Sequence, residues 1–287
     1  MFIATLIAAD RLSESDISAA AALLADAEGG WLERGSAYDF VLSSPDRVEA
    51  MLRGALPRVD VVIQPAKHRR KRLLVADMDS TMISVECIDE LADYAGLKAE
   101  VAEITERAMQ GELDFEAALD ARVALLAGLD AEMIDRCREE RVRLTPGATT
   151  LVRTMRAQGA TCLLVSGGFT RFAEPVAQAI GFNRSLANEL LVDEGRLTGK
   201  VKRPIVGAAA KHDALTQAMA ELGLQREQTL AVGDGANDIP MIEAAGLGVA
   251  YHAKPAAAAA ADARILHNDL TALLYAQGIR RSEWVAA

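Results

Sequence analysis

Cysteine and long apolar runs are scarce in this chain of 287 residues, and each absence narrows the class of protein. The three cysteines, Cys87, Cys137 and Cys162, are far apart and include no Cys-x-x-Cys pair, so we expect buried thiols in a reducing compartment. No apolar stretch is long enough to cross a bilayer, and no charged start is followed by an apolar segment and a cleavage site. These absences predict a cytoplasmic protein.

Positive charge is also limited. The chain has 31 Lys and Arg residues against 41 Asp and Glu residues, a formal net charge of −10. That balance argues against a nucleic-acid partner and against an anionic membrane surface. It leaves an anionic substrate open, because a metal ion or a few local cations can invert the field inside a cleft. Hydrophobic residues make up 51% of the chain and charged residues 25%, which is typical of a soluble globular protein.

The segment 1–66 predicts a small α+β unit. Its expected order is strand, helix, strand, strand, helix, strand, over residues 2–9, 13–27, 31–33, 38–42, 45–56 and 59–63. This order fits a ferredoxin-like module and resembles, in pattern, the ACT-type amino-acid-sensing domain. The turn over residues 9–12 lacks the glycine that such domains commonly use to admit a ligand. A packing role and a homodimer interface therefore stay open beside effector binding.

A basic run, Lys67-His68-Arg69-Arg70-Lys71-Arg72, follows this unit. Because it is short and attached to an acidic chain, we expect a solvated linker rather than a nucleic-acid contact. Over residues 73–287, apolar runs alternate with helical stretches, a pattern typical of a parallel sheet covered on both faces. The expected strands cover residues 73–76, 162–165, 229–232 and 247–250, and a hairpin is expected over residues 191–201. A long helical insertion at about 88–142 predicts a cap over the edge of the sheet.

Three of these expected strands end in polar residues of an unusual kind. The first is followed by Asp77-Met78-Asp79-Ser80-Thr81, the second by Ser166-Gly167-Gly168, and the third by Gly233-Asp234-Gly235-Ala236-Asn237-Asp238. In an open α/β sheet, ligands bind beyond the carboxyl ends of the strands, so we expect these segments to share one site. Each motif alone is weak evidence, but their order along the chain fits the alternation of strands and helices.

The acidic residues in these segments favour phosphoryl transfer. Asp77 and Asp234 offer hard oxygens suited to Mg²⁺, which commonly also binds a substrate phosphate. An aspartate is ionised at neutral pH, so Asp77 can attack phosphorus without an activating base. Asp79, two residues on, can protonate a leaving alkoxide and later deprotonate water.

The remaining polar residues favour binding of the phosphate itself. The hydroxyl of Ser166 and the backbone of Gly167-Gly168 offer hydrogen-bond donors to phosphate oxygens, and glycine permits close approach. Lys211 is expected just before a helix over residues 213–222. A cation and a helix N-terminus together would stabilise the charge on the transferring phosphoryl group.

Together these residues resemble the motifs of the haloacid dehalogenase superfamily of phosphohydrolases, from about residue 72 to the C-terminus. The matching residues are Asp77, Asp79 and Thr81 in the first motif, Ser166 in the second, Lys211 in the third, and Asp234 and Asp238 in the fourth. The resemblance implies an α/β fold, with a Rossmann-like parallel sheet and a helical cap. It implies Asp77 as nucleophile and Asp79 as general acid and base. It also implies Mg²⁺ held by the carboxylates of Asp77 and Asp234 and the backbone carbonyl of Asp79, with Asp238 supporting these ligands.

Within this superfamily, the cap is similar to that of the phosphoserine phosphatase family. The shared pattern consists of Val85-Glu86-Cys87-Ile88-Asp89-Glu90, then Met109, then Leu113-Asp114-Phe115-Glu116 leading to Arg122-Val123-Ala124-Leu125-Leu126. The resemblance implies that Glu86 and Arg122 bind the ammonium and the carboxylate of phosphoserine. It implies that Phe115 and Met109 close the lid over the substrate. The phosphate would then be held by Asn237, Ser166, Gly167 and Lys211.

The resemblance therefore implies hydrolysis of O-phospho-L-serine through a phosphoaspartate, the last step of L-serine biosynthesis. A phosphotransferase, or a phosphatase for a related small phosphomonoester, stays open because the sequence does not show whether water or an alcohol attacks the intermediate. An alternative of another class is an amino-acid-responsive regulatory protein that senses through residues 1–66. The complete set of motif residues argues against a purely non-enzymatic role.

Overall fold

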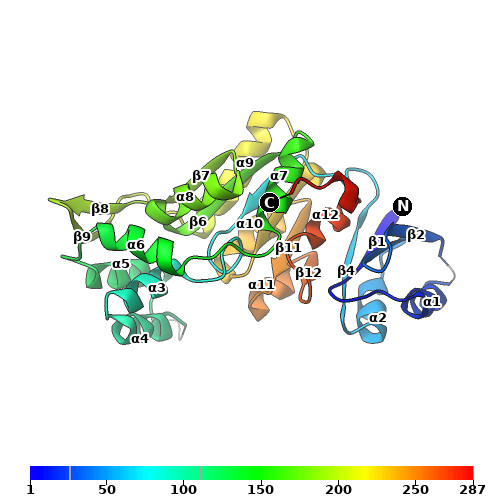
Figure 1. Ribbon diagram of the computed structural model, residues 1–287, viewed down its shortest axis with the longest axis horizontal. Helices are drawn as coiled ribbons and strands as arrows, with labels where there is room; N and C mark the ends of the chain where they lie inside the picture. Colours follow the sequence, from blue (N-terminus) through cyan, green and yellow to red (C-terminus); the bar gives the residue numbers. More distant parts are fainter. Residues whose placement is uncertain (26, 110–111, 287) are drawn as a thin grey trace.

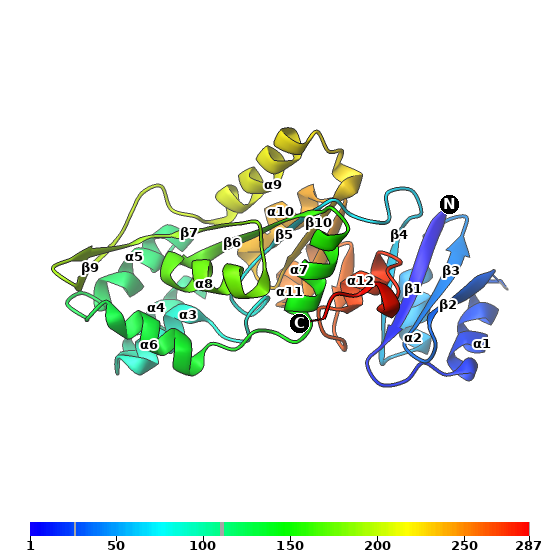
Figure 2. The same ribbon diagram turned by 45° about the horizontal axis from the view of Figure 1, so that its top comes forward.

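The computed structural model describes residues 1–25, 27–109 and 112–286, with the side chains of residues 108 and 109 outside the description. Figure 1 shows an elongated molecule with a small sheet near the N-terminus at one end, a larger sheet in the centre and a group of helices at the other end. The turned view in Figure 2 shows the same arrangement. Among the described helices, none combines the length and the apolar character needed to cross a membrane.

The N-terminal sheet contains four antiparallel strands in the order β2-β3-β1-β4. Its elements are β1 (Phe2–Ala8), α1 (Glu14–Leu23), β2 (Gly29–Glu33), β3 (Ala37–Leu42), α2 (Val48–Ala55) and β4 (Val59–Pro65). The order of elements agrees with the ferredoxin-like prediction, but both helices are shorter than predicted. Helix α1 ends early because Ala25 has a left-handed backbone (φ 51°), and α2 begins late because Arg47 has one too (φ 61°).

The central sheet contains six parallel strands in the order β12-β11-β10-β5-β6-β7. The strands are β5 (Leu73–Ala76), β6 (Thr161–Phe169), β7 (Arg184–Asn188), β10 (Thr229–Gly233), β11 (Leu247–Tyr251) and β12 (Ala263–Ile265). Every residue of β5, β10 and β11 is buried, which explains their continuous apolar runs. The sequence pattern missed the two edge strands, because β7 carries exposed side chains and β12 has only three residues.

Helices cover both faces of this sheet, as predicted. One face packs against α7 (Ala148–Ala157), α8 (Thr170–Ile180) and α12 (Ala272–Ala276), and the other against α9 (Ala208–Leu222) and α10 (Ile239–Ala244). Helix α11 (Pro255–Ala260) follows β11, and short 3-10 turns occur at Arg226–Gln228, Ala236–Asp238 and Arg281–Glu283. The predicted α/β fold is therefore confirmed.

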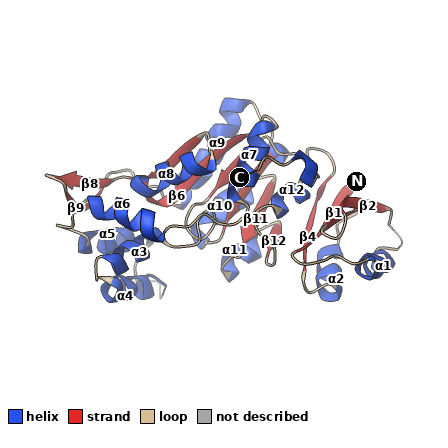
Figure 3. Cartoon of the chain, in the orientation of Figure 1, coloured by secondary structure: helices blue, strands red, loops and turns tan. Residues whose placement is uncertain are grey.

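The helical insertion contains α3 (Cys87–Tyr94), α4 (Lys98–Met109), α5 (Phe115–Leu125) and α6 (Glu132–Arg141). Figure 3 shows these helices grouped at the end of the molecule opposite the N-terminal sheet. The predicted hairpin forms β8 (Leu190–Asp193) and β9 (Arg196–Val201), and β9 packs against α5. A bridge between Asp130 and Arg196 adds to this contact. The hairpin thus attaches the cap to the central unit.

The basic run at residues 67–72 agrees only in part with the predicted solvated linker: Lys67, Arg70 and Arg72 are exposed, but Arg69 and Lys71 are not. Lys71 is only 6% exposed and donates to the carbonyl oxygen of Glu227 (2.9 Å). Arg69 donates to both carboxylate oxygens of Asp39 (2.7 Å each) and to the carbonyl oxygen of Ala276 (2.8 Å). The physical reason is that the N-terminal sheet packs directly against the central unit, so Arg69 finds partners on both, while Lys71 is buried against the central unit.

Candidate active site

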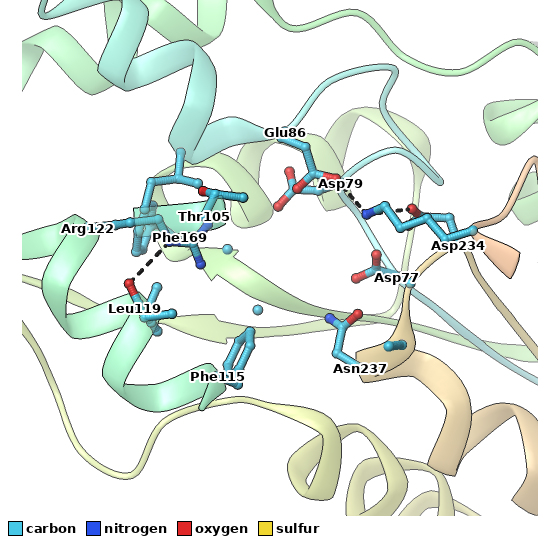
Figure 4. A pocket seen from close by; sticks show the side chains of 17 residues that line it. Asp77, Asp79, Glu86, Thr105, Phe115, Leu119, Arg122, Phe169, Asp234 and Asn237 are labelled. Carbon is cyan, nitrogen blue, oxygen red and sulfur yellow. Dashed lines mark hydrogen bonds and ion pairs between the residues drawn. The ribbon is translucent and has the colours of Figure 1, made fainter. Parts of the chain in front are cut away.

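The carboxyl ends of β5, β6 and β10 meet at one cavity of about 360 Å³ beneath the cap (Figure 4). The predicted site residues that line it are Asp77, Asp79, Glu86, Phe115, Arg122, Gly167, Asp234 and Asn237. Ser166 and Lys211 are fully buried next to it. The side chain of Met109 lies outside the described residues. Three segments that are far apart in the sequence therefore share one site.

The turn after β5 places the carboxylate of Asp77 at the base of the cavity. The backbone N–H of Asp77 donates to the carbonyl oxygen of Val232 (3.0 Å), which continues the ladder between β5 and β10. The next residues turn sharply: Ser80 has a left-handed backbone (φ 55°), and the N–H groups at 82 and 83 donate back to Met78. The sheet therefore fixes Asp77, while the chain beyond it leaves for the cap.

Asp79 lies at the boundary between the sheet and the cap. Its Oδ1 accepts from the backbone N–H of Cys87 at the start of α3 (3.2 Å). A Cβ atom at Gly168 would lie 2.8 Å from its Oδ2, so the close approach requires glycine. Burial, with the nearby Glu86, raises the pKa of Asp79 to about 7. This carboxyl can therefore carry a proton near neutral pH.

Lys211 lies inside the first turn of α9 and not before the helix, contrary to the prediction. The helix begins at Ala208 because three alanines, all strong helix formers, precede Lys211 and follow the extended Gly207. Its Nζ donates to Oδ1 of Asp77 and to Oδ1 of Asp238 (2.6 Å). The lysine is thus positioned behind the carboxylate of Asp77 by its helix.

Three carboxylates, those of Asp77, Asp234 and Asp238, have oxygen atoms that all lie within 4.8 Å of one another. Asp238 uses both of its oxygens within the protein. Its Oδ1 accepts from Lys211 (2.6 Å), and its Oδ2 accepts from the backbone N–H groups of Asp234 (3.1 Å) and Gly235 (2.9 Å). The carboxylates of Asp77 and Asp234 are therefore the two that face the cavity.

The cluster of three carboxylates is suited to binding a hard divalent cation. Burial, reinforced by Asp238, raises the pKa of Asp77 well above its ordinary range, and burial raises the pKa of Asp234 to about 6. A cation between the two would offset both their desolvation and their repulsion. Carboxylate oxygens are also the donors that Mg²⁺ prefers.

Asn188, which the sequence analysis missed, holds the glycine loop in place. Its Nδ2 donates to the carbonyl oxygens of Gly167 (2.9 Å) and Val206 (3.2 Å), and its Oδ1 accepts from the N–H of Val206 (2.7 Å). Ser166 lies behind the wall formed by Gly167 and Gly168, and its Oγ accepts from the N–H of Gly168 (2.9 Å). Asn188 thereby joins the end of β6 to the segment before α9.

The cap contributes Glu86, Phe115 and Arg122. Figure 4 shows Arg122 and Phe115 on α5, on the side of the cavity away from Asp77. Arg122 donates from Nε to the carbonyl oxygen one turn earlier, and Glu86 accepts from the hydroxyl of Ser80 (2.8 Å). The cavity therefore has acidic groups at the sheet end and a cation at the cap end.

Lys254 also lines the cavity and was not predicted. Its Nζ lies 3.5 Å from Oδ2 of Asp234 and 4.0 Å from Oε1 of Glu86. A signal for it was present in the sequence: Lys254 follows the apolar run 247–250, whose carboxyl end had to lie at the same edge of the sheet. Thr105 of α4 is a further lining residue that carried no motif.

This fold and site define the class of protein. Residues 74–243 match the haloacid dehalogenase-like hydrolase family, and the chain belongs to that family. It is 46% identical to a phosphoserine phosphatase of Streptomyces coelicolor over 88% of this chain and 63% of that protein. The chain therefore spans less than two thirds of the length of this curated relative.

Solved structures of similar proteins agree with this assignment. A probable phosphoserine phosphatase from Vibrio cholerae, in its unliganded form, is 33% identical with a TM-score of 0.77, over 96% of this chain and 88% of that chain. A substrate-bound phosphoserine phosphatase complex is 38% identical with a TM-score of 0.67, over 72% of this chain and 98% of that chain. The predicted family resemblance is confirmed.

Proposed function

We propose that this protein is a phosphatase that hydrolyses O-phospho-L-serine to L-serine and phosphate through a phosphoaspartate. The observation that carries this proposal is the meeting of Asp77, Asp79 and Asp234 with Glu86 and Arg122 around one cavity. The relatives named phosphoserine phosphatase support the choice of substrate. The three acids supply the chemistry, and the cap pair matches the ammonium and the carboxylate of the substrate.

The reaction has two steps. In the first, an oxygen of Asp77 attacks phosphorus, the bond from phosphorus to the serine oxygen breaks, and Asp79 gives its proton to the departing alkoxide. In the second, a water molecule loses a proton to Asp79 and attacks phosphorus, and the bond to Asp77 breaks. Phosphate leaves, and both aspartates return to their starting states. Lys211, which contacts Asp77, keeps that carboxylate in place throughout.

Asp77 and Asp234 would hold Mg²⁺ with their carboxylates, and Asp79 with its backbone carbonyl. Asp238 supports them through Lys211 and the backbone of Asp234. The bound ion would supply positive charge that reduces the repulsion between a carboxylate nucleophile and a phosphate dianion.

The cap residues select the substrate. Arg122 takes the carboxylate of phosphoserine, and Glu86 takes its ammonium group. Phe115, with Met109, closes the lid over the serine moiety and excludes water. The phosphate is held by Asn237, Ser166, Gly167 and Lys211. We also infer that residues 1–66 form an ACT-like unit, and residues 73–287 a phosphatase core with its cap at about 88–142.

Phosphate release from a panel of phosphomonoesters tests the proposal. The panel contains phosphoserine, phosphothreonine, phosphoethanolamine and an aryl phosphate, with the Asp77→Asn variant as the control that lacks a nucleophile. We expect phosphoserine to be the best substrate, EDTA to stop turnover, Mg²⁺ to restore it, and Asp77→Asn to lower kcat by at least about 1000-fold. Equal rates on all four esters, or transfer of phosphate to an added alcohol in place of water, would contradict the assignment.

A further inference from the structure

Lys254 is an exposed cation in an otherwise acidic part of the cavity. Among the described residues that line the cavity, Arg122 and Lys254 carry the positive charge, while Asp77, Asp79, Glu86 and Asp234 are acidic. The side chain of Lys254 is 67% exposed, so its ammonium group can reach a ligand. A phosphomonoester brings two negative charges into this space, and a nearby ammonium group lowers that cost.

The backbone around Lys254 is fixed on both sides. The N–H of Lys254 donates to the carbonyl oxygen of Asp234 (2.9 Å). Two residues earlier, His252 leaves β11 with a left-handed backbone (φ 44°), and its N–H donates to the carbonyl oxygen of Ile265 (2.9 Å). Its ring Nε2 donates to the carbonyl oxygen of Asn268 (3.0 Å). The position of Lys254 therefore depends on the loop that follows β12.

That loop is held by a residue of the N-terminal sheet. Asp60 of β4 is 1% exposed, and all four of its hydrogen-bond donors belong to residues 266–268. The donors are the backbone N–H groups of Leu266 (2.9 Å), His267 (3.2 Å) and Asn268 (3.0 Å), and the side-chain amide of Asn268 (2.8 Å). A buried carboxylate with so many donors holds their backbone in one conformation.

These contacts form one continuous path from the N-terminal sheet to the cavity. It runs from Asp60 to Asn268, from Asn268 to His252, and along the backbone from His252 to Lys254. We propose that Lys254 is a further phosphate-binding residue, and that Asp60 of the N-terminal sheet acts as a positioning residue for it. This inference rests on the proposed phosphatase function and gives the N-terminal sheet an indirect part in substrate binding.

The role of Lys254 is tested with Lys254→Met and Lys254→Arg. We expect Lys254→Met to raise KM for phosphoserine roughly tenfold with kcat within about twofold, because it removes one charge-assisted contact to the substrate. Lys254→Arg keeps the charge and should stay within about threefold of the parent KM. Lys202→Met is the matched control, since Lys202 pairs with Glu189 on an exposed surface away from the cavity.

Binding without turnover gives a second readout. Calorimetry with phosphoserine on the Asp77→Asn variant should show a roughly tenfold weaker Kd when Lys254→Met is added. An unchanged Kd and an unchanged KM would overturn the role of Lys254. A parent protein that releases no phosphate from any ester would instead overturn the proposed function, so the two failures are distinguishable.

The role of Asp60 is tested by combining Asp60→Asn with Lys254→Met and asking whether their effects on KM are independent. We expect Asp60→Asn to raise KM about threefold in the parent protein and to have no further effect when Lys254 is already Met, because both changes act on the same contact. Asp39→Asn is the matched control: Asp39 lies at the same contact between sheets, but its partner Arg69 donates to Tyr275 and Ala276 and not to the 266–268 loop.

A purely structural role for Asp60 predicts a different pattern. In that case Asp60→Asn would lower the unfolding midpoint and leave KM unchanged, or it would raise KM equally in the parent protein and in Lys254→Met. Either result overturns the positioning role. His252→Ala, which removes an exposed ring from the same path, supplies the measurement if Asp60→Asn does not fold. It should raise KM about threefold in the parent protein and should likewise have no effect beside Lys254→Met.

Discussion

Lys211 is a fully buried cation whose charge is maintained by its two carboxylate partners. Burial alone would lower the pKa of Lys211, but Asp77 and Asp238 raise it above its ordinary value. Lys211 therefore stays charged, and removing it would leave the buried carboxyl groups of Asp77 and Asp238 without their cation. At the scale of single residues, the site is assembled before any substrate arrives.

Under the proposed function, substrate choice depends on Arg122, which lines the cavity on the cap side. Arg122→Ala should lower kcat/KM for phosphoserine about 100-fold, since a bidentate pair with the substrate carboxylate is lost. An aryl phosphate has no such carboxylate, so its hydrolysis should fall by less than about threefold. Steady-state kinetics on both substrates measure the difference.

Arg136→Ala serves as the control for this comparison. Arg136 is an exposed arginine of the cap helix α6 and does not line the cavity. Both substrates should keep their parent rates in this variant. Equal losses of kcat/KM on the two substrates in Arg122→Ala would show that Arg122 supports the fold of the cap and does not recognise the substrate carboxylate.

At the scale of elements, the sequence predicted those site residues that directly follow a recognisable strand. A buried strand followed at once by acidic residues or glycines can be recognised in the sequence, as β5 followed by Asp77 shows. Lys254 follows a buried strand too, but it stands three residues beyond the end of β11 and was overlooked. Asn188 could not be found in this way, because it acts on residues that are distant in sequence. Asn188 lies on an edge strand whose mixed polar pattern hides it, and its partners come from two other segments.

Asn188→Ala tests how much the joined loops depend on one side chain. The change removes the Asn188 donor from the partly buried carbonyl oxygen of Gly167 and the buried one of Val206, so the free energy of unfolding should fall by about 1–3 kcal/mol. The glycine loop should also shift, and kcat should fall at least about fivefold. Urea denaturation and steady-state kinetics measure the two effects.

Asn183→Ala is the control at the opposite end of the same strand pair. Asn183 accepts from the backbone N–H of Cys162, at the start of β6 and away from the cavity (2.8 Å). It should lower stability without changing kcat. If Asn188→Ala likewise lowered the free energy of unfolding but left kcat unchanged, the Asn188 contact would be structural and would not position the loop.

At the scale of the whole molecule, the N-terminal sheet is not an appendage. Sequence patterns predicted the order of its elements. The basic run after it was predicted to be solvated, because the density of charge in a sequence does not show which groups those charges contact. The structure shows that one of these cations, Arg69, contacts Asp39 and the carbonyl groups at the end of α12. One apolar cluster also runs from Ile7 and Val62 of this sheet into the central core.

Arg69→Met tests how strongly the two sheets are held together. The guanidinium donates to both oxygens of Asp39 and to the hydroxyl of Thr5 (2.8 Å), and the side chains of Arg69 and Asp39 are each 15% exposed. Removing it leaves a largely buried carboxylate without its partner, so the free energy of unfolding should fall by about 2–4 kcal/mol. The exposed pair of Arg34 and Glu14 provides the comparison, and Arg34→Met should cost less than about 1 kcal/mol. Urea denaturation of the full chain measures both values. Similar costs for the two variants would mean that the contact between the sheets depends on its apolar cluster and not on this ion pair.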